Sequence, residues 1–207
     1  MSRRFTFFSL AFFLLCACSA SAAEDEWTPR TGDIVFQEST SSQSAAIAAA
    51  TGSRWTHVGV VFVEGGAAWV FEGVQPVGVS LLDRWMASGK GGTVVVKRLK
   101  EADKLLTPDV LKRMTAVREN LTGKDYDLLF GWSDEEIYCS ELVWKLFDRA
   151  AGIQLGKLEK LRDFALDLPV VRAKLKERYG NAVPMDETVI SPGSLFEDRH
   201  LLTVYRR

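Results

Sequence analysis

The residues of this chain best suited to chemistry are one cysteine, one histidine and one glutamate that lie far apart in the sequence. Cys139 stands in the run Tyr138-Cys139-Ser140-Glu141-Leu142-Val143-Trp144, and His57 is one of only two histidines. A cysteine nucleophile needs a base that takes its proton, and a carboxylate can hold that base in one tautomer. These residue types predict nucleophilic chemistry at Cys139 with His57 as the base.

Cys139 is also the only cysteine expected in the mature chain, because Cys16 and Cys18 lie within a predicted export signal. A lone thiol in an exported protein has no partner for an internal disulfide, so either packing or reactivity must explain it. A free cysteine that packs as a small apolar residue is the alternative interpretation. The neighbours of Cys139 decide between the two.

The export signal has three parts in the expected order. Arg3 and Arg4 precede an apolar stretch, residues 5–16, which is too short to span a bilayer as a helix. Small residues at 20–23 then predict cleavage just before Glu24. Residues 15–18 also form a loose lipobox, in which cleavage before Cys18 would leave a lipidated N-terminus. We favour simple secretion to the periplasm or envelope, with the lipoprotein as the alternative, and expect residues 24–207 to form a single domain.

His57 begins a run of β-branched and aromatic residues, 57–63, and a second run covers residues 69–74. Gly65-Gly66 is a strong two-residue hairpin signal. If it forms the turn, Glu64 pairs with Ala67, Gly59 with Glu72, and His57 with Val74. Glu72 then lies diagonally beside His57 on the same face of the sheet, within reach of the imidazole. This register predicts Glu72 as the orienting carboxylate.

Cys139 is expected at the start of an amphipathic helix that buries Leu142, Val143, Leu146 and Phe147. A sulfur at a helix N-terminus is exposed to unpaired backbone N–H groups and to the positive end of the helix dipole. The same N–H groups could stabilise an oxyanion in acyl transfer. We expect the acidic residues 134–136 just upstream to face solvent or a cationic substrate group.

The remaining pattern predicts a strand-rich first half and a helix-rich second half. Further strands are expected at 32–36, 93–98 and 201–205, and helices at 42–50 and from Pro108 to near Gly123. Residues 155–179 are expected to be mostly helical, with an interruption at Pro169. The net charge of −1 gives no basic excess, so nucleic acid is not expected as a partner. No second apolar stretch approaches the length of a membrane span, and neither histidine stands in a metal-ligand cluster.

Three segments carry a resemblance to NlpC-type papain-like hydrolases. Residues 139–143 resemble the Cys-Ser-x-Leu-Val helix start of these enzymes, residues 56–61 their histidine strand, and residues 32–36 their Gly-Asp strand. The histidine precedes the cysteine here, which is the order in the permuted papain-like amidases of the YaeF/YiiX group. Five further segments also resemble that group: 41–44, 123–127, 138–144, 178–180 and 190–192. Asp125 departs from the proline expected in the Gly-Lys-Pro-Tyr-Asp segment.

The resemblance implies an α+β fold of the circularly permuted papain-like type, in which the helix bearing Cys139 packs against an antiparallel sheet. It implies a triad of Cys139, His57 and Glu72, the carboxylate that the hairpin register also predicts. Tyr138 would shape an acyl pocket beside the nucleophile, with Ser140 as a further substrate-binding residue. Asp33 would lie at the rim of the site or bind a substrate amine, and a turn-capping role for Asp33 is the alternative.

The function predicted on these grounds is hydrolysis of an amide bond through an acyl-enzyme, without a metal or cofactor. The substrate would be a small peptide, an N-acyl amino acid or a lipid-like molecule. A lipid-directed acyltransferase or thioesterase with the same triad is the second possibility, with residues 155–179 as a lid over an apolar acyl pocket; ordinary helical packing is favoured for that segment. The third possibility is a non-catalytic envelope protein that binds a peptide or lipid. The sequence predicts no oligomeric state.

Overall fold

The computed structural model describes residues 27–207, and the predicted export signal with Cys16 and Cys18 lies outside the described residues. Six strands form one antiparallel sheet in the order β4-β3-β2-β1-β5-β8. Their bounds are β1 (Ile34–Gln37), β2 (His57–Glu64), β3 (Ala67–Glu72), β4 (Gly78–Leu81), β5 (Val94–Leu99) and β8 (Leu201–Arg206). A second, two-stranded sheet pairs β6 (Glu159–Lys160) with β7 (Thr188–Val189).

The helices are α1 (Ser44–Thr51), α2 (Leu82–Ser88), α3 (Ala102–Leu105), α4 (Pro108–Leu121), α5 (Cys139–Ala151), α6 (Pro169–Tyr179) and α7 (Pro192–Phe196). Short 3-10 turns cover Lys90–Gly92 and Leu161–Asp163. Among residues 27–207 no helix combines the length and apolar character that a membrane crossing requires.

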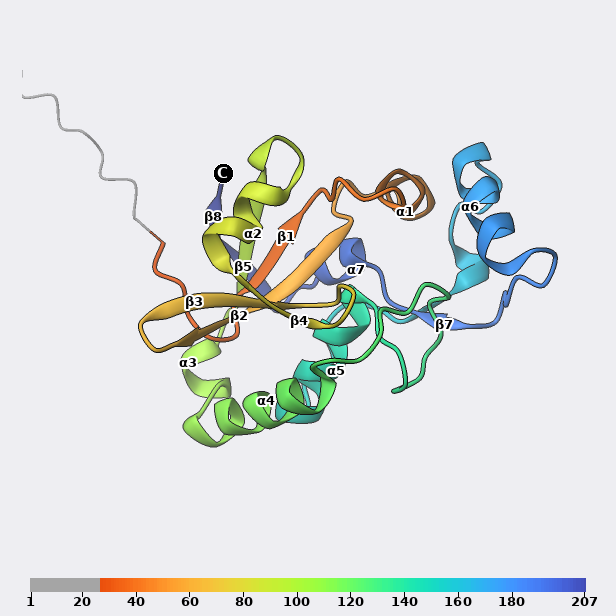
Figure 1. The fold of residues 1–207 in the computed structure, drawn as a ribbon. Helices are drawn as coiled ribbons and strands as arrows, with labels where there is room; N and C mark the ends of the chain where they lie inside the picture. The colour runs from red at the N-terminus through yellow and green to blue at the C-terminus, as the bar shows by residue number, and fades with distance from the viewer. Residues whose placement is uncertain (1–26) are drawn as a thin grey trace, which may run out of the picture.

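Helices cover both faces of the large sheet. Side chains alternate between the two faces along each strand, and each face carries apolar side chains that the helices bury. Figure 1 shows α4 and α5 on one side of the sheet and α2 on the other. Phe36, Val60 and Phe71 pack on the side of α5, whose Leu142 and Phe147 are fully buried against them. Val35, Val61 and Val70 face α2 instead, where they contact Trp85 and Met86. The predicted α+β fold, with the Cys139 helix against an antiparallel sheet, is confirmed.

The hairpin of β2 and β3 has the predicted register. Glu64 pairs with Ala67 and Gly59 with Glu72, so the turn lies at Gly65-Gly66. The predicted pairing of His57 with Val74 is wrong, because β3 ends at Glu72 and His57 pairs with Gln37 of β1. His57 is therefore the first residue of β2. On one side it pairs with Gln37 of β1, and on the other side β3 has already ended at Glu72.

Residues 155–179 differ from the mostly helical segment that was predicted. Their first part forms β6 and the turn Leu161–Asp163, and α6 begins at Pro169 instead of being interrupted there. Proline is well suited to a first helical position, since an N–H at that position would have no partner within the helix. The helix α6 lies away from the large sheet and packs beside α1 (Figure 1).

Candidate active site

Cys139 is the first residue of α5, as predicted, and Tyr138 is its N-cap. The Glu141 carboxylate accepts a hydrogen bond from the backbone N–H of Tyr138 at 3.3 Å, which satisfies one of the donors at the helix start. Cys139 itself is only 3 % exposed. Asp134, Glu135 and Glu136 are exposed, and Asp134 pairs with Lys145 and Arg149 at 2.8 and 2.6 Å, so these carboxylates face away from the buried sulfur.

His57 and Glu72 meet across the hairpin as the register predicted. The imidazole Nε2 lies 2.6 Å from Glu72 Oε2, and both side chains are largely buried. With Nε2 bonded to the carboxylate, Nδ1 is the ring nitrogen left to exchange a proton with Cys139. The structure therefore brings together all three residues that were predicted for the triad.

The charge state of His57 follows from these neighbours. Burial acts to lower its pKa, but hydrogen bonding to Cys139 and Glu72 and the negative charges of both partners outweigh burial and raise the pKa to about 10. At neutral pH the ring is therefore an imidazolium next to the sulfur. An imidazolium in this place is the proton donor that a departing amine requires.

Two donors hold the Glu72 carboxylate, and neither was predicted. Trp85 Nε1 donates to Oε2 at 2.8 Å, and Ser80 Oγ donates to Oε1 at 2.6 Å. The Trp85 ring also stacks on His57 with 5.8 Å between centroids. Burial acts to raise the pKa of Glu72, yet the bonds from His57, Ser80 and Trp85 keep that pKa below its usual value. Glu72 is thus fixed as an anion in one orientation.

Two glycines allow this close packing. A Cβ atom at Gly59 would lie 2.4 Å from Val70 Cγ1 and 2.9 Å from the Phe71 carbonyl oxygen. A Cβ atom at Gly73, the residue after Glu72, would lie 2.7 Å from the Cys139 backbone nitrogen. The absence of a side chain at Gly73 therefore lets the end of β3 touch the first turn of α5, which brings Glu72 and His57 to the sulfur.

Tyr138 and Ser140, which flank the nucleophile, are both tied to Ile190. The Tyr138 hydroxyl accepts from the Ile190 N–H at 3.0 Å, and Ser140 Oγ donates to the Ile190 carbonyl oxygen at 2.8 Å. Both side chains also line the cavity beside Cys139. They hold the start of α5 against the segment that leads into α7.

The prediction that Asp33 lies at the rim of the site is wrong. Asp33 is 1 % exposed, forms an ion pair with Arg98 at 2.6 Å, and accepts from Trp27 Nε1 and the Arg30 N–H. It precedes β1, whereas the strand end next to His57 is Gln37. Asp33 has the turn-capping role that was the alternative, because its carboxylate is fully used in holding the N-terminal turn.

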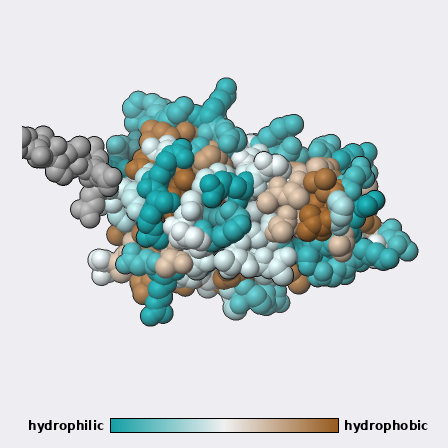
Figure 2. Space-filling model, turned by 90° about the horizontal axis from the view of Figure 1, so that it is seen from above, coloured by the Kyte–Doolittle hydropathy of each residue, from teal (hydrophilic) through white to brown (hydrophobic). Residues whose placement is uncertain are grey.

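A cavity opens beside Cys139, between α1 and α6; we call it the α1–α6 pocket. The empty space between its walls amounts to about 760 Å³, a volume that includes the part open to solvent. Its walls are mainly apolar, and Figure 2 shows hydrophobic side chains at the surface of the end of the molecule that carries α1 and α6. The apolar lining comprises Ala46, Ile47, Ala50, Phe130, Leu161, Phe164, Leu166, Val171, Leu175, Val189, Ile190 and Pro192.

These features define a class. A cysteine at the start of a helix, a histidine on the first strand of an adjacent antiparallel hairpin and a carboxylate on the second strand form a papain-like arrangement. The histidine strand comes before the cysteine helix in the chain, so the arrangement is the permuted one.

The chain belongs to the permuted papain-like amidase enzyme family, YaeF/YiiX, C92, whose family model matches residues 28–205. It is 41 % identical over 191 residues to the protein YiiX of Escherichia coli strain K12, covering 92 % of this chain and 93 % of that protein. It also resembles the crystal structure of YiiX from Escherichia coli O157:H7, with a TM-score of 0.83 and 42 % identity, over 87 % of this chain and 99 % of that chain. The fold and the family expected from the sequence are thereby confirmed.

The description of that crystal structure calls the E. coli protein a metalloprotein. Within residues 27–207 of the present chain, no cluster of three or more histidine, cysteine, aspartate or glutamate side chains is arranged to hold a metal ion. The imidazole of His57 is bonded to the carboxylate of Glu72, and that carboxylate also accepts from Ser80 and Trp85. The donor set at Cys139 does not fit a resident metal, and the chemistry below uses none.

Proposed function

We propose that this protein is a thiol hydrolase that cleaves an amide bond whose acyl side is apolar. One observation carries the proposal: Cys139, next to the His57–Glu72 pair, opens onto the apolar α1–α6 pocket. A nucleophile beside an oriented base is the arrangement of covalent acyl transfer. An apolar pocket beside the nucleophile suits the acyl group that is transferred, because burial of apolar surface drives its binding.

The reaction proceeds in two halves. With His57 as an imidazolium that already holds the proton of the thiol, the sulfur of Cys139 forms a bond to the amide carbonyl carbon, and the carbonyl electron pair moves to oxygen. When this electron pair re-forms the C=O bond, the C–N bond breaks and the amine leaves with the proton from His57. Water then loses a proton to His57 and attacks the thioester, and the C–S bond breaks to release the acid. Glu72 stabilises the imidazolium in both halves.

The α1–α6 pocket favours N-acyl amino acids or lipid-like amides over small polar peptides as substrates. Val171 and Leu175 of α6 line it together with Ala46 and Ile47 of α1. Because residues of the segment 155–179 line this pocket, we favour the interpretation that the segment covers an acyl pocket over ordinary helical packing. An acyltransferase would use the same first half and replace water by an acceptor hydroxyl or amine. The predicted export signal supports a role in the periplasm or envelope.

The proposal is tested with a series of N-acyl p-nitroanilides whose acyl chains grow from two to twelve carbons. We expect kcat/KM to rise with chain length, and Cys139→Ala to abolish release of nitroaniline while the circular dichroism spectrum is kept. Ala46→Phe, which fills the α1–α6 pocket, should shift the optimum to shorter chains. Ala45→Phe is the matched control, because Ala45 is an exposed neighbour on the same helix.

Two outcomes would contradict the proposal. Turnover that persists in Cys139→Ala would remove Cys139 as the nucleophile. Binding of long-chain amides without turnover in the unaltered protein would favour the non-catalytic envelope protein that the sequence left open.

A further inference from the structure

Exposed apolar side chains are concentrated around the α1–α6 pocket. Twelve large apolar residues are exposed within residues 27–207, and six of them lie in the loop next to Phe130 or in the segment 155–189, both of which contribute to the pocket wall. These six are Leu128, Leu129, Leu158, Leu168, Val170 and Met185. Single exposed apolar residues are common on soluble proteins, but a group of them beside a cavity indicates an interaction surface.

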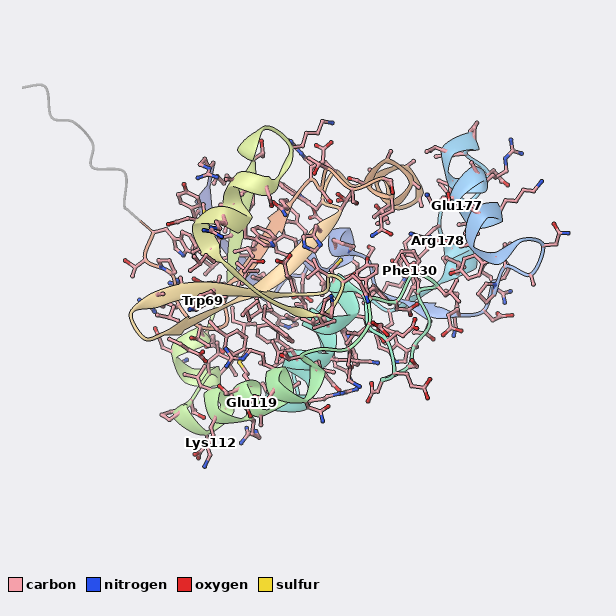
Figure 3. All side chains as sticks on the ribbon, viewed as in Figure 1. Trp69, Lys112, Glu119, Phe130, Glu177 and Arg178 are labelled. Atoms are coloured by element: carbon pink, nitrogen blue, oxygen red, sulfur yellow. The ribbon has the colours of Figure 1, made fainter. Side chains whose placement is uncertain are left out.

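The apolar side chains lie at both ends of α6. At its C-terminal end, the Tyr179 hydroxyl donates to the carbonyl oxygen of Leu129. Figure 3 shows Arg178 of α6 beside Phe130 of the same loop, with 4.7 Å between the guanidinium and the ring centroid. At the other end, Leu168 is the N-cap of the helix. The exposed leucines therefore flank a helix that is about 16 Å long.

The outward face of α6 carries positive charge between these apolar ends. The helix has four basic residues and one acidic residue, although the whole chain has a net charge of −1. The acidic residue, Glu177, pairs with Lys174 at 2.7 Å. Arg172 and Lys176 are exposed and form no ion pair within residues 27–207. They share one face of the helix, because residues four apart are neighbours on a helix surface.

One kind of partner fits both the apolar and the basic side chains. A second copy of this chain would bring two sets of unpaired basic residues together, and like charges repel each other. A bilayer that contains anionic lipids supplies negative charge at its surface and an apolar interior below it. Figure 2 shows hydrophobic side chains next to hydrophilic ones at the end of the molecule that carries α1 and α6. That end is therefore suited to an anionic bilayer.

We propose that α6 and the loop 128–130 form a membrane-docking surface that places the mouth of the α1–α6 pocket against an anionic bilayer. The surface, which we call the α6 surface, comprises Leu128, Leu129, Leu168, Val170, Arg172 and Lys176. Its apolar side chains enter the boundary between head groups and acyl chains, and its basic side chains contact lipid phosphates. The inference goes beyond the proposed function, because docking requires no bond cleavage. An apolar substrate then passes from the bilayer into the pocket without crossing water.

The basic part of the surface is tested by sedimentation of the chain without its predicted export signal. The probes are vesicles of phosphatidylcholine with and without phosphatidylglycerol. We expect binding to the mixed vesicles that weakens in high salt, because salt screens charges near a surface. Lys176→Gln should lower the partition coefficient about fivefold, the contribution of one basic residue near an anionic membrane. Lys112→Gln is the matched control and should bind like the wild type, since Lys112 lies on α4, away from α6 (Figure 3).

The apolar part of the surface is tested by combining Leu128→Ser with Leu168→Ser. We expect the partition coefficient to fall about tenfold or more, because two leucine side chains lose their burial in the bilayer. Leu202→Ser is the control: Leu202 is also exposed, but it lies on the edge strand β8 and should not contribute. Binding that depends on Lys176 but not on these leucines would be electrostatic adsorption, which would overturn the docking surface.

The remaining outcomes separate this inference from the proposed function. Cys139→Ala should bind vesicles like the wild type, so a failure of the hydrolase proposal would leave docking intact. The surface variants should keep wild-type turnover of a soluble short-chain p-nitroanilide. If the wild type does not bind the mixed vesicles, the docking surface is wrong whatever the activity. If the leucine variant instead changes the sedimentation coefficient of the protein alone, the surface is a contact between copies, and the proposal is likewise overturned.

Discussion

The imidazole of His57 and the carboxylate of Glu72 are joined by a hydrogen bond of 2.6 Å between the first residue of β2 and the last residue of β3. The backbone hydrogen bonds between β2 and β3 hold the two residues in place, so the orientation of the base depends on paired strands and not on a loop. Trp85 and Ser80 also donate to the Glu72 carboxylate, to Oε2 and Oε1 respectively, and the remaining ring nitrogen of His57 serves Cys139.

Replacing Glu72 by glutamine keeps the shape of this pair and removes its charge. Ser80 can turn its hydroxyl to accept from the new amide, so the fold should be retained. We expect kcat to fall by up to about 10⁴-fold, the loss found when a triad carboxylate is neutralised. The alkaline limb of the pH–rate profile should also move down from about 10, since the lost anion no longer favours the imidazolium.

Glu64→Gln is the matched control for that substitution. Glu64 lies on β2 and pairs with Arg118 at 2.8 Å on the surface. Its loss should leave both kcat and the pH profile unchanged. An unaltered alkaline limb in Glu72→Gln would contradict the role given to the pair.

Gly73 is predicted to be intolerant of any side chain. In Gly73→Ala the new Cβ would lie 2.7 Å from the Cys139 nitrogen and 2.8 Å from its Cα, both backbone atoms that cannot turn aside. The start of α5 must then move, and displacements near 1 Å at a reacting centre cost about 10²-fold in rate. Turnover and iodoacetamide alkylation should fall together. Gly78→Ala, in the adjoining strand with its nearest contact at 3.7 Å, should be close to wild type in both assays.

Trp85 should contribute to stability through its bond to Glu72. Trp85→Phe keeps an aromatic ring next to His57 but removes the indole N–H that donates to the buried carboxylate at 2.8 Å. Loss of a hydrogen bond to a charged group costs about 1.5–3 kcal/mol, which should appear as a lower midpoint in urea unfolding. Trp69→Phe on β3 is the control, because Trp69 is half-buried and donates no hydrogen bond to the Glu72 side chain. An equally large loss of stability in Trp69→Phe would assign the effect to ring volume instead.

Glu141 should make stability depend on pH. The carboxyl is fully buried, and burial outweighs its ion pair with Lys145, so its pKa is raised from 4.5 to about 7. The folded state then binds a proton that the unfolded state has lost, and the free energy of unfolding falls as pH rises from 4.5 to 7, by at most about 3 kcal/mol.

Glu141→Gln should flatten this dependence in urea titrations at successive pH values. The other two shifted groups of the site act mainly outside this window. The stability from His57 is complete below pH 6.5 and is lost as pH rises toward 10, and that from Glu72 is lost as pH falls below 4.5. Glu136→Gln, an exposed neighbour, should keep the wild-type slope. An equal slope in Glu141→Gln and wild type would refute the assignment.

The parts of the site that the sequence could predict are those set by local rules. The Gly65-Gly66 turn fixes the register of β2 and β3, and the register alone brings Glu72 to His57. The amphipathic pattern after Cys139 likewise fixes the start of α5. Both are decided by residues close together in the chain.

The parts that could not be predicted depend on contacts between distant segments. Trp85 reaches Glu72 from α2, a helix of seven residues with no pattern strong enough to predict it. The α1–α6 pocket exists because α6 packs beside α1, more than a hundred positions away. Asp33 was misplaced because a buried aspartate near a strand start has the same local sequence whether it binds substrate or, as here, Arg98.

The central claim is that Cys139 carries the acyl group of an apolar amide. The most direct measurement is mass spectrometry of the protein quenched during turnover of N-decanoyl p-nitroanilide, followed by peptide mapping. We predict a decanoyl thioester on Cys139 in the wild type and none in Cys139→Ala or His57→Ala. A decanoyl group on any other residue, or undiminished release of nitroaniline by Cys139→Ala, would contradict it.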